Sequence, residues 1–205
     1  MTLQNRVMPD GAIVALAARG TLMGNRGILH DDTKTLGRAR WTHRNWVCCE
    51  LAFKGRTREL MRAGGYYTEL FFLDEAVALA AGHRPCGECR RADHLAFRAA
   101  WGRAFGAQVP AAEMDKVLHA GRVIPRKRLH ATYHEQLAKL PEGTFIRDSQ
   151  NSYLVRADHL LLFTPDGYSA AQTRAGDAFV TVLTPMPMVA VLAAGYRPRL
   201  HQSAQ

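Results

Sequence analysis

The chain has 205 residues, of which 47% are hydrophobic and 22% are charged, and its formal net charge is +9. This composition excludes a disordered or fibrous protein and suffices for one core, or for one core with a small second domain. No apolar run reaches membrane-spanning length, and the first residues lack the apolar segment of a signal peptide. We therefore expect a cytoplasmic protein without membrane association, in which cysteines stay reduced.

The N-terminal part predicts short strands separated by glycine-containing turns. An apolar run at 12–18 predicts a strand, and 47–53 is apolar enough for a strand or a short helix. Segment 66–72 is aromatic and β-prone, and 73–81 then predicts a helix. Acidic residues in the first turn suit the dipole of this helix, and Gly82 stands where a helix-ending glycine is expected.

Two further helices are predicted at 86–105 and 112–120. In the first of them Phe97, Trp101 and Phe105 recur at every fourth position, which is typical of a helix face that packs into a core. After the second helix the chain is rich in basic residues and histidines.

After Pro141 the composition becomes typical of β-structure. Strands are expected at 144–146, 152–156, 160–163 and 178–183. A last helix is expected to begin at Pro185, a residue that suits the first helical position, and to end before Gly195.

All four cysteines fall in two tight pairs, Cys48-Cys49 and Cys86-x-x-Cys89. A C-x-x-C turn brings two thiolates to one ion at about 2.3 Å from each sulfur, and zinc is the usual ion of such a site. Ordinary buried cysteines are the alternative. We therefore predict an α+β protein with a small zinc-stapled N-terminal domain containing helices, residues 1–140. A mainly β portion, residues 141–205, follows it and ends in a helix.

Residues 70–76, Leu-Phe-Phe-Leu-Asp-Glu-Ala, and 81–90, Ala-Gly-His-Arg-Pro-Cys-Gly-Glu-Cys-Arg, resemble the metal-binding domain of the bacterial adaptive-response DNA repair protein Ada. That family has two phenylalanines, an alanine-rich helix and then Gly-Phe-Arg-Pro-Cys-x-x-Cys. The resemblance covers roughly residues 48–90. It implies a zinc ion held by four cysteines, DNA bound by nearby basic residues, and transfer of a methyl group from a DNA phosphotriester to one zinc thiolate. Cys86 and Cys89 are the ligands that carry over directly.

The first cysteine pair departs from the Ada pattern. The family separates its first two cysteines by three residues, whereas Cys48 and Cys49 are adjacent. Because neighbouring side chains of a strand point to opposite faces, we expect one ion to take only one of them. The fourth ligand is then a water or a histidine, and His83 and His94 are the nearest in sequence. An open position would make the site catalytic or reactive.

Zinc-dependent nucleoside and nucleobase deaminases offer an alternative interpretation. Their His/Cys-x-Glu and Pro-Cys-x-x-Cys motifs match this chain at 48–50 and 85–89. In that case Glu50 would move protons to and from a zinc-bound hydroxide. The zinc ligands would be Cys48, Cys86 and Cys89. The predicted helix before Pro85 argues against this interpretation, because deaminases place a core strand there. Independently of this interpretation, His94 lies one turn beyond Cys89 on the apolar stripe of the predicted helix and is a candidate catalytic group that contacts the metal or the substrate.

The excess positive charge lies with the cysteines. Residues 1–140 carry 22 Lys and Arg against 13 Asp and Glu, whereas residues 141–205 carry five of each. Nucleic acid is the commonest partner of such a charge, and a solvated basic surface is the alternative. We predict a zinc protein that binds nucleic acid, DNA in preference to RNA, in damage recognition or repair, with or without enzyme activity. The candidate phosphate contacts are Arg84, Arg90, Arg91, Arg126, Lys127 and Arg128.

Overall fold

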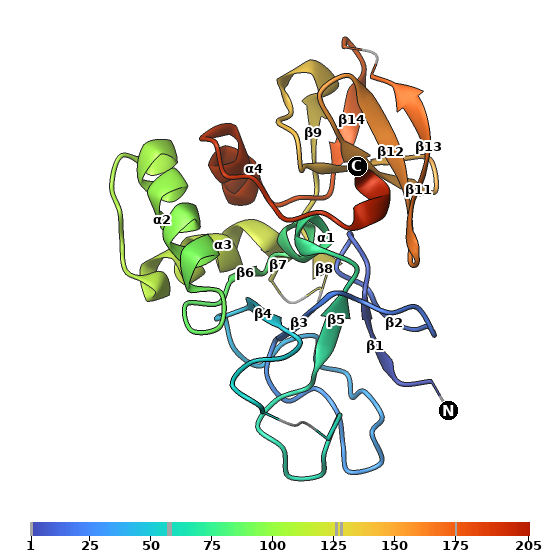
Figure 1. The fold of residues 1–205 in the computed structure, drawn as a ribbon, viewed down its shortest axis with the longest axis vertical. Helices are drawn as coiled ribbons and strands as arrows, with labels where there is room; N and C mark the ends of the chain where they lie inside the picture. Colours follow the sequence, from blue (N-terminus) through green and yellow to red (C-terminus); the bar gives the residue numbers. More distant parts are fainter. Residues whose placement is uncertain (1, 57–58, 126, 128, 175) are drawn as a thin grey trace.

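The described part of the chain contains four α-helices and two six-stranded sheets (Figure 1). The computed structural model describes residues 2–56, 59–125, 127, 129–174 and 176–205. Helices occur together with mainly antiparallel or mixed sheets, which confirms the predicted α+β class. Within these residues no helix is both long enough and apolar enough to cross a membrane.

The N-terminal sheet has the strand order β2-β1-β5-β3-β4-β6. Its strands are β1 (Gln4–Val7), β2 (Ile13–Ala15), β3 (Leu22–Asn25), β4 (Val47–Glu50), β5 (Leu70–Phe72) and β6 (Arg84–Pro85). Strand β3 pairs antiparallel with β4 and β5, whereas β4 pairs in parallel with β6. The last pairing sets Cys48 opposite Pro85 and thereby brings the second cysteine pair beside β4.

The C-terminal sheet is antiparallel, with the order β13-β12-β11-β10-β14-β9. Its strands are β9 (Tyr133–Gln136), β10 (Phe145–Asp148), β11 (Asn151–Val155), β12 (His159–Thr164), β13 (Gly167–Thr173) and β14 (Phe179–Val182). The four strands expected after Pro141 are therefore present, and the sheet gains β9 and β13. A separate ribbon joins β7 (Val123–Ile124) and β8 (Leu129–His130).

Helix α1 (Glu75–Ala80) lies between the two sheets, and all of its residues are buried (Figure 1). The Asp74 carboxylate accepts a hydrogen bond from the Val77 amide at 3.0 Å and caps the helix. Gly82 follows with a φ of +84°, as its place after the predicted helix requires. The other helices are α2 (Arg91–Phe105), α3 (Ala111–Arg122), α4 (Met186–Ala193), and the 3₁₀ turns η1 (Leu137–Lys139) and η2 (Gln202–Ala204).

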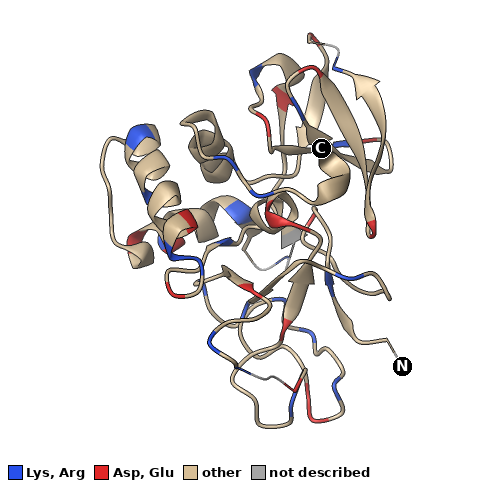
Figure 2. Cartoon of the chain, in the orientation of Figure 1, with Lys and Arg blue, Asp and Glu red and all other residues tan. Residues whose placement is uncertain are grey.

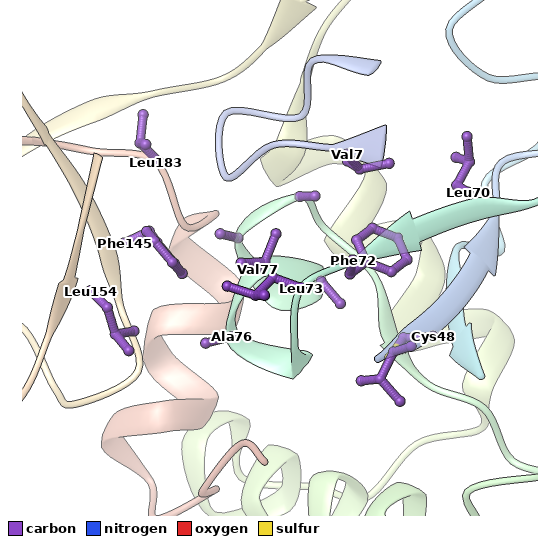
Figure 3. Packing of buried hydrophobic residues seen from close by; sticks show 14 of the residues in the cluster. Val7, Cys48, Leu70, Phe72, Leu73, Ala76, Val77, Phe145, Leu154 and Leu183 are labelled. Atoms are coloured by element: carbon purple, nitrogen blue, oxygen red, sulfur yellow. The ribbon is translucent and has the colours of Figure 1, made fainter. Parts of the chain in front are cut away.

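The largest buried cluster joins both halves of the chain. Figure 3 shows Phe72 and Val77 from the N-terminal half packed in one cluster with Phe145 and Leu154. This cluster therefore contains residues from both sides of position 140, where the sequence predicts that the C-terminal portion begins. A second cluster unites α2, α3 and α4. Phe97 and Trp101 of the predicted helix face belong to it, whereas Phe105 is 44% exposed.

Candidate metal centre

Three of the four cysteines converge at one point of the described structure. The Sγ atoms of Cys49, Cys86 and Cys89 all lie within 4.8 Å of one another, a spacing at which they could hold a metal ion. Two sulfurs on one tetrahedral zinc ion lie about 3.7 Å apart, given a Zn–S distance of about 2.3 Å. The cluster is partly buried, so its thiols are shielded from solvent but reachable from it.

The alternation of side chains along β4 decides which of the adjacent cysteines joins this cluster. Cys48 is fully buried in the core, and its Sγ accepts a hydrogen bond from Nη1 of Arg90 at 2.9 Å. Cys49 points to the opposite face, toward Cys86. The expectation that one ion would take only one of the pair thus agrees with the geometry, and Cys48 is corrected from a candidate ligand to a core residue.

The loop between β6 and α2 places the second cysteine pair. The Cys86 amide donates to the Cys48 carbonyl at 2.9 Å, which extends the β4–β6 pairing into the loop. A side chain at Gly87 would come within 3.4 Å of the His94 ring, so the loop rests on the first turn of α2. These contacts place Cys86 and Cys89 next to Cys49.

Hydrogen bonds to sulfur favour a thiolate in the cluster. The Cys86 pKa is lowered to about 5, first by a hydrogen bond from the Cys49 thiol and further by backbone amides that include that of Glu88, at 3.4 Å. The Cys49 pKa is raised in turn, because the Cys49 thiol donates its proton in the hydrogen bond to Cys86 and because Cys49 is buried. Burial also raises the pKa of Cys89. One ionised sulfur with two further thiols in reach is a soft ligand set of the kind that binds zinc.

Neither candidate histidine joins the three thiols. His83 is fully buried, with its ring 4.7 Å from the Phe72 ring and 5.2 Å from the Trp46 ring. The Nδ1 atom of His94 lies 3.3 Å from the Pro85 carbonyl oxygen, and its ring supports the loop from below. His83 therefore lies in the core away from the thiols, and His94 lies beneath the loop that carries Cys86 and Cys89.

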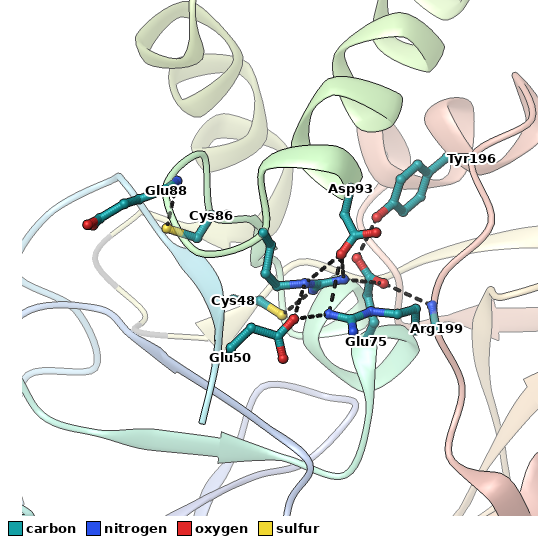
Figure 4. A network of polar contacts seen from close by, with 9 residues as sticks. Cys48, Glu50, Glu75, Cys86, Glu88, Asp93, Tyr196 and Arg199 are labelled. Atoms are coloured by element: carbon teal, nitrogen blue, oxygen red, sulfur yellow. Dashed lines mark hydrogen bonds and ion pairs between the residues drawn. The ribbon is translucent and has the colours of Figure 1, made fainter. Parts of the chain in front are cut away.

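Glu50 lies on the same face of β4 as Cys48 and is held by two arginines (Figure 4). Its carboxylate contacts Nη2 of Arg199 and lies 3.6 Å from Nε of Arg90. Arg90 in turn contacts the buried carboxylate of Glu75 at 2.7 Å. The deaminase interpretation requires Cys48 and Glu50 on the side of the other thiols. The structure places both on the opposite side, where Glu50 belongs to an ion-pair network.

Two of the predicted phosphate contacts are internal. Arg84 is buried and makes two parallel hydrogen bonds to Asp115, at 2.8 and 2.7 Å. The Arg90 side chain is 0% exposed and belongs to the same ion-pair network as Glu50 and Glu75. Both are corrected to structural residues, because their guanidiniums are occupied by carboxylates inside the protein. Of the others, Arg91 and Lys127 are exposed, whereas Arg126 and Arg128 lie outside the described residues.

A basic loop that the sequence does not assign to the site lies at its rim. Arg56 forms an ion pair with Glu88 of the C-x-x-C turn at 2.5 Å. Lys54 is exposed in the same loop, and both cations lie over the Phe53 ring. The signal was available as the run Lys-Gly-Arg at 54–56, but only the fold brings this loop to the cysteines. Figure 2 shows basic positions spread over the N-terminal loops and helices, with acidic positions among them.

Comparisons with known proteins do not identify a relative. No family model matches the chain, and no curated protein or solved structure is found to be similar to it. The resemblance to Ada therefore rests only on the sequence motifs of this chain at 70–76 and 81–90. The metal centre is supported by the geometry described above.

Proposed function

We propose that the protein binds one zinc ion through Cys49, Cys86 and Cys89 and uses the zinc-held region to bind nucleic acid. The convergence of the three thiols is the observation that carries this proposal. Thiolates select zinc over the hard cations, and three protein ligands leave a fourth position for water or for a group of the bound partner. The Ada-like run around Cys86 favours the same metal and makes DNA the favoured partner.

The proposed ion would join two segments that are far apart in sequence. Cys49 lies in β4, and Cys86 and Cys89 flank the turn before α2. A metal bound in this way adds its binding free energy to the stability of the folded state. The ion would also fix the C-x-x-C turn, to which Arg56 of the basic loop is attached through Glu88.

Exposed cations near the thiols support the nucleic-acid part of the proposal. Lys54 and Arg56 belong to the rim, and Arg91 is exposed at the start of α2, two residues after Cys89. Cations of this kind displace counterions from phosphates, so binding weakens steeply as salt rises. These residues replace the two internal arginines as the candidate phosphate contacts.

Zinc content tests the metal centre. The purified protein is expected to contain one zinc per chain by mass spectrometry of the metal, and the Cys86→Ser variant is expected to lose it. Full zinc content in that variant, or none in the wild type after refolding with zinc, would refute the metal centre.

DNA binding across a salt series tests the partner. The variant Lys54→Gln with Arg91→Gln removes two exposed cations beside the thiols, and Lys116→Gln with Lys139→Gln removes two exposed cations elsewhere. The first pair is expected to reduce the slope of log K against log salt by about 2, and the control pair to leave it unchanged. Equal effects of the two pairs, or no binding at low salt, would refute the nucleic-acid proposal.

A further inference from the structure

Two arginines are buried around one tryptophan without a carboxylate partner. Arg26 is 1% exposed and Arg122 is 0% exposed, and their guanidinium carbons lie 4.4 and 3.9 Å from the centre of the Trp46 ring. Among the described residues neither makes an ion pair. The carboxylates that act on them through space also pair with other arginines, since Asp115 pairs with Arg84 at 2.7 Å and Asp10 pairs with Arg147 at 3.1 Å.

Backbone carbonyls satisfy part of the hydrogen bonding of these arginines but not their charge. Arg26 donates to the Gly11 carbonyl at 3.1 Å and to the Ala81 carbonyl at 3.4 Å. Arg122 donates to the Gly82 carbonyl at 2.6 Å, and its Nε is buried without a partner. A buried charge without a counter-charge costs several kcal/mol, which is why buried cations in proteins are ordinarily paired. An anion beside Arg26 would offset that cost for this arginine.

A cavity of about 330 Å³ leads to Arg26 from the surface. Arg40, Trp41 and His130 also line it. Both ring nitrogens of His130 are buried without a hydrogen-bond partner. Since a neutral imidazole carries one N–H and one acceptor nitrogen, this ring lacks an acceptor for its proton. The ring nitrogens are closed to solvent, so His130 is an unused donor in the wall of the cavity, which two cations also line.

The charge of the cavity indicates the kind of anion that would fit. Arg26 and Arg40 contribute two positive charges, whereas the Asp10 carboxylate at the mouth is neutralised by Arg147. A carboxylate ligand would leave one positive charge unpaired. A phosphate monoester carries about −1.5 to −2 at neutral pH and offers three acceptor oxygens, which matches two guanidiniums and one imidazole.

We propose that this cavity is a binding site for a phosphate monoester, held by the guanidiniums of Arg26 and Arg40 and by the ring of His130. None of these residues belongs to the thiol cluster, so the site does not depend on the proposed zinc ion. The phosphate could be carried by a small sugar phosphate or by the 5′ end of a nucleic acid strand. Trp41 provides an aromatic wall on which a terminal base could stack.

Calorimetric titration of the full chain tests the site, with inorganic phosphate, ribose 5-phosphate, a 5′-phosphorylated oligonucleotide and the same oligonucleotide with a 5′-hydroxyl. Arg40→Gln is the test variant because Arg40 is only partly buried and lies outside the core. Arg19→Gln is the control, since it removes the same charge from an exposed position outside the cavity. We expect Arg40→Gln to weaken phosphate binding about ten-fold or more and Arg19→Gln to change it less than two-fold.

The pattern across the four probes identifies the source of the phosphate. Binding of the small phosphates, lost in Arg40→Gln, supports a sugar-phosphate ligand. A preference for the 5′-phosphorylated oligonucleotide over its 5′-hydroxyl form, lost in the same variant, supports a strand end. Absence of saturable binding by every phosphate probe, or equal weakening in the two variants, would overturn the proposal.

A second measurement uses the wild-type protein alone. The ring signals of His130 in a nitrogen–proton NMR spectrum are expected to shift on addition of inorganic phosphate, and unchanged signals under saturating phosphate would also overturn the site. The zinc content of the same samples is read independently. Failure of the phosphate site and failure of the metal centre are therefore distinguishable.

Discussion

The adjacent cysteines of β4 allow a sharp test, because the same substitution at neighbouring positions should have opposite consequences. Cys49→Ala removes one of the three converging thiols. Cys48→Ala removes a sulfur that is 0% exposed and that contacts Arg90 instead of the cluster. The first variant is expected to lose zinc and the second to retain it.

The structure sets the magnitudes of the two effects. Loss of residues that merely orient metal ligands typically weakens metal binding 10- to 100-fold, so loss of the Cys49 ligand itself should weaken zinc binding about 100-fold or more. Cys48→Ala should leave zinc affinity within about two-fold. It should lower the free energy of unfolding by about 1–3 kcal/mol, because it leaves a small cavity and removes the acceptor at 2.9 Å from Nη1 of Arg90.

Urea unfolding with and without a zinc chelator, together with competition for zinc by a chromophoric chelator, measures both quantities. At free zinc about 100-fold above its dissociation constant, wild type and Cys48→Ala should each lose about 2.7 kcal/mol when the chelator is added. Cys49→Ala should be insensitive to chelator. Chelator sensitivity in Cys49→Ala, or zinc loss in Cys48→Ala, would refute the assignment of the two faces of β4.

Two further predictions concern buried charge. Arg90→Met should destabilise the protein by about 3–5 kcal/mol in urea unfolding, because the Glu75 carboxylate, 1% exposed, loses its ion pair at 2.7 Å. Adding Glu75→Gln should restore part of the loss. A double variant whose destabilisation equals the sum of the two single effects would contradict this. Burial, and then the neighbouring guanidinium of Arg26, lower the pKa of His83 and His130 well below 6.5. The unfolded chain therefore takes up protons below pH 6.5 that the folded chain does not. The free energy of unfolding should consequently fall by about 1.4 kcal/mol for each histidine with every pH unit by which the pH is lowered below 6.5. Equal stability at pH 7.5 and 5.5 would contradict that expectation.

Local patterns made much of the fold predictable. The helix at 73–81 combines acidic residues in its first turn with a glycine after its end, and the structure has α1 at Glu75–Ala80 followed by Gly82. Strand alternation predicted that Cys48 and Cys49 would face opposite sides. It could not tell which of them faces the C-x-x-C turn, because that depends on the side of β4 on which the chain after β6 passes.

The roles of the arginines were not predictable in the same way. An arginine that meets a phosphate and one that meets an internal carboxylate look alike in a sequence. The partner of Arg84 is Asp115, on a helix that no local pattern connects to it. The pairing of Glu50 with Arg199 joins β4 to the end of the chain. Such long-range pairs arise from packing, and they removed two of the predicted phosphate contacts.

The segment between β4 and β5 explains why a metal suits this position in the fold. Among its described residues at 51–69, Met61 is the only buried hydrophobic one, and the polar Thr68 and Glu69 are buried next to β5, so the basic turn at 54–56 is not packed into a hydrophobic core. The Arg56–Glu88 ion pair attaches its basic turn to the C-x-x-C loop, but both side chains are about half exposed, and an exposed pair of this kind contributes at most about 1 kcal/mol. An ion bound by Cys49 and the C-x-x-C thiols would fix both the start of the segment and the loop to which its turn is attached. The rim cations Lys54 and Arg56 would then be ordered by the zinc centre and not by a core, which couples the two parts of the proposed function.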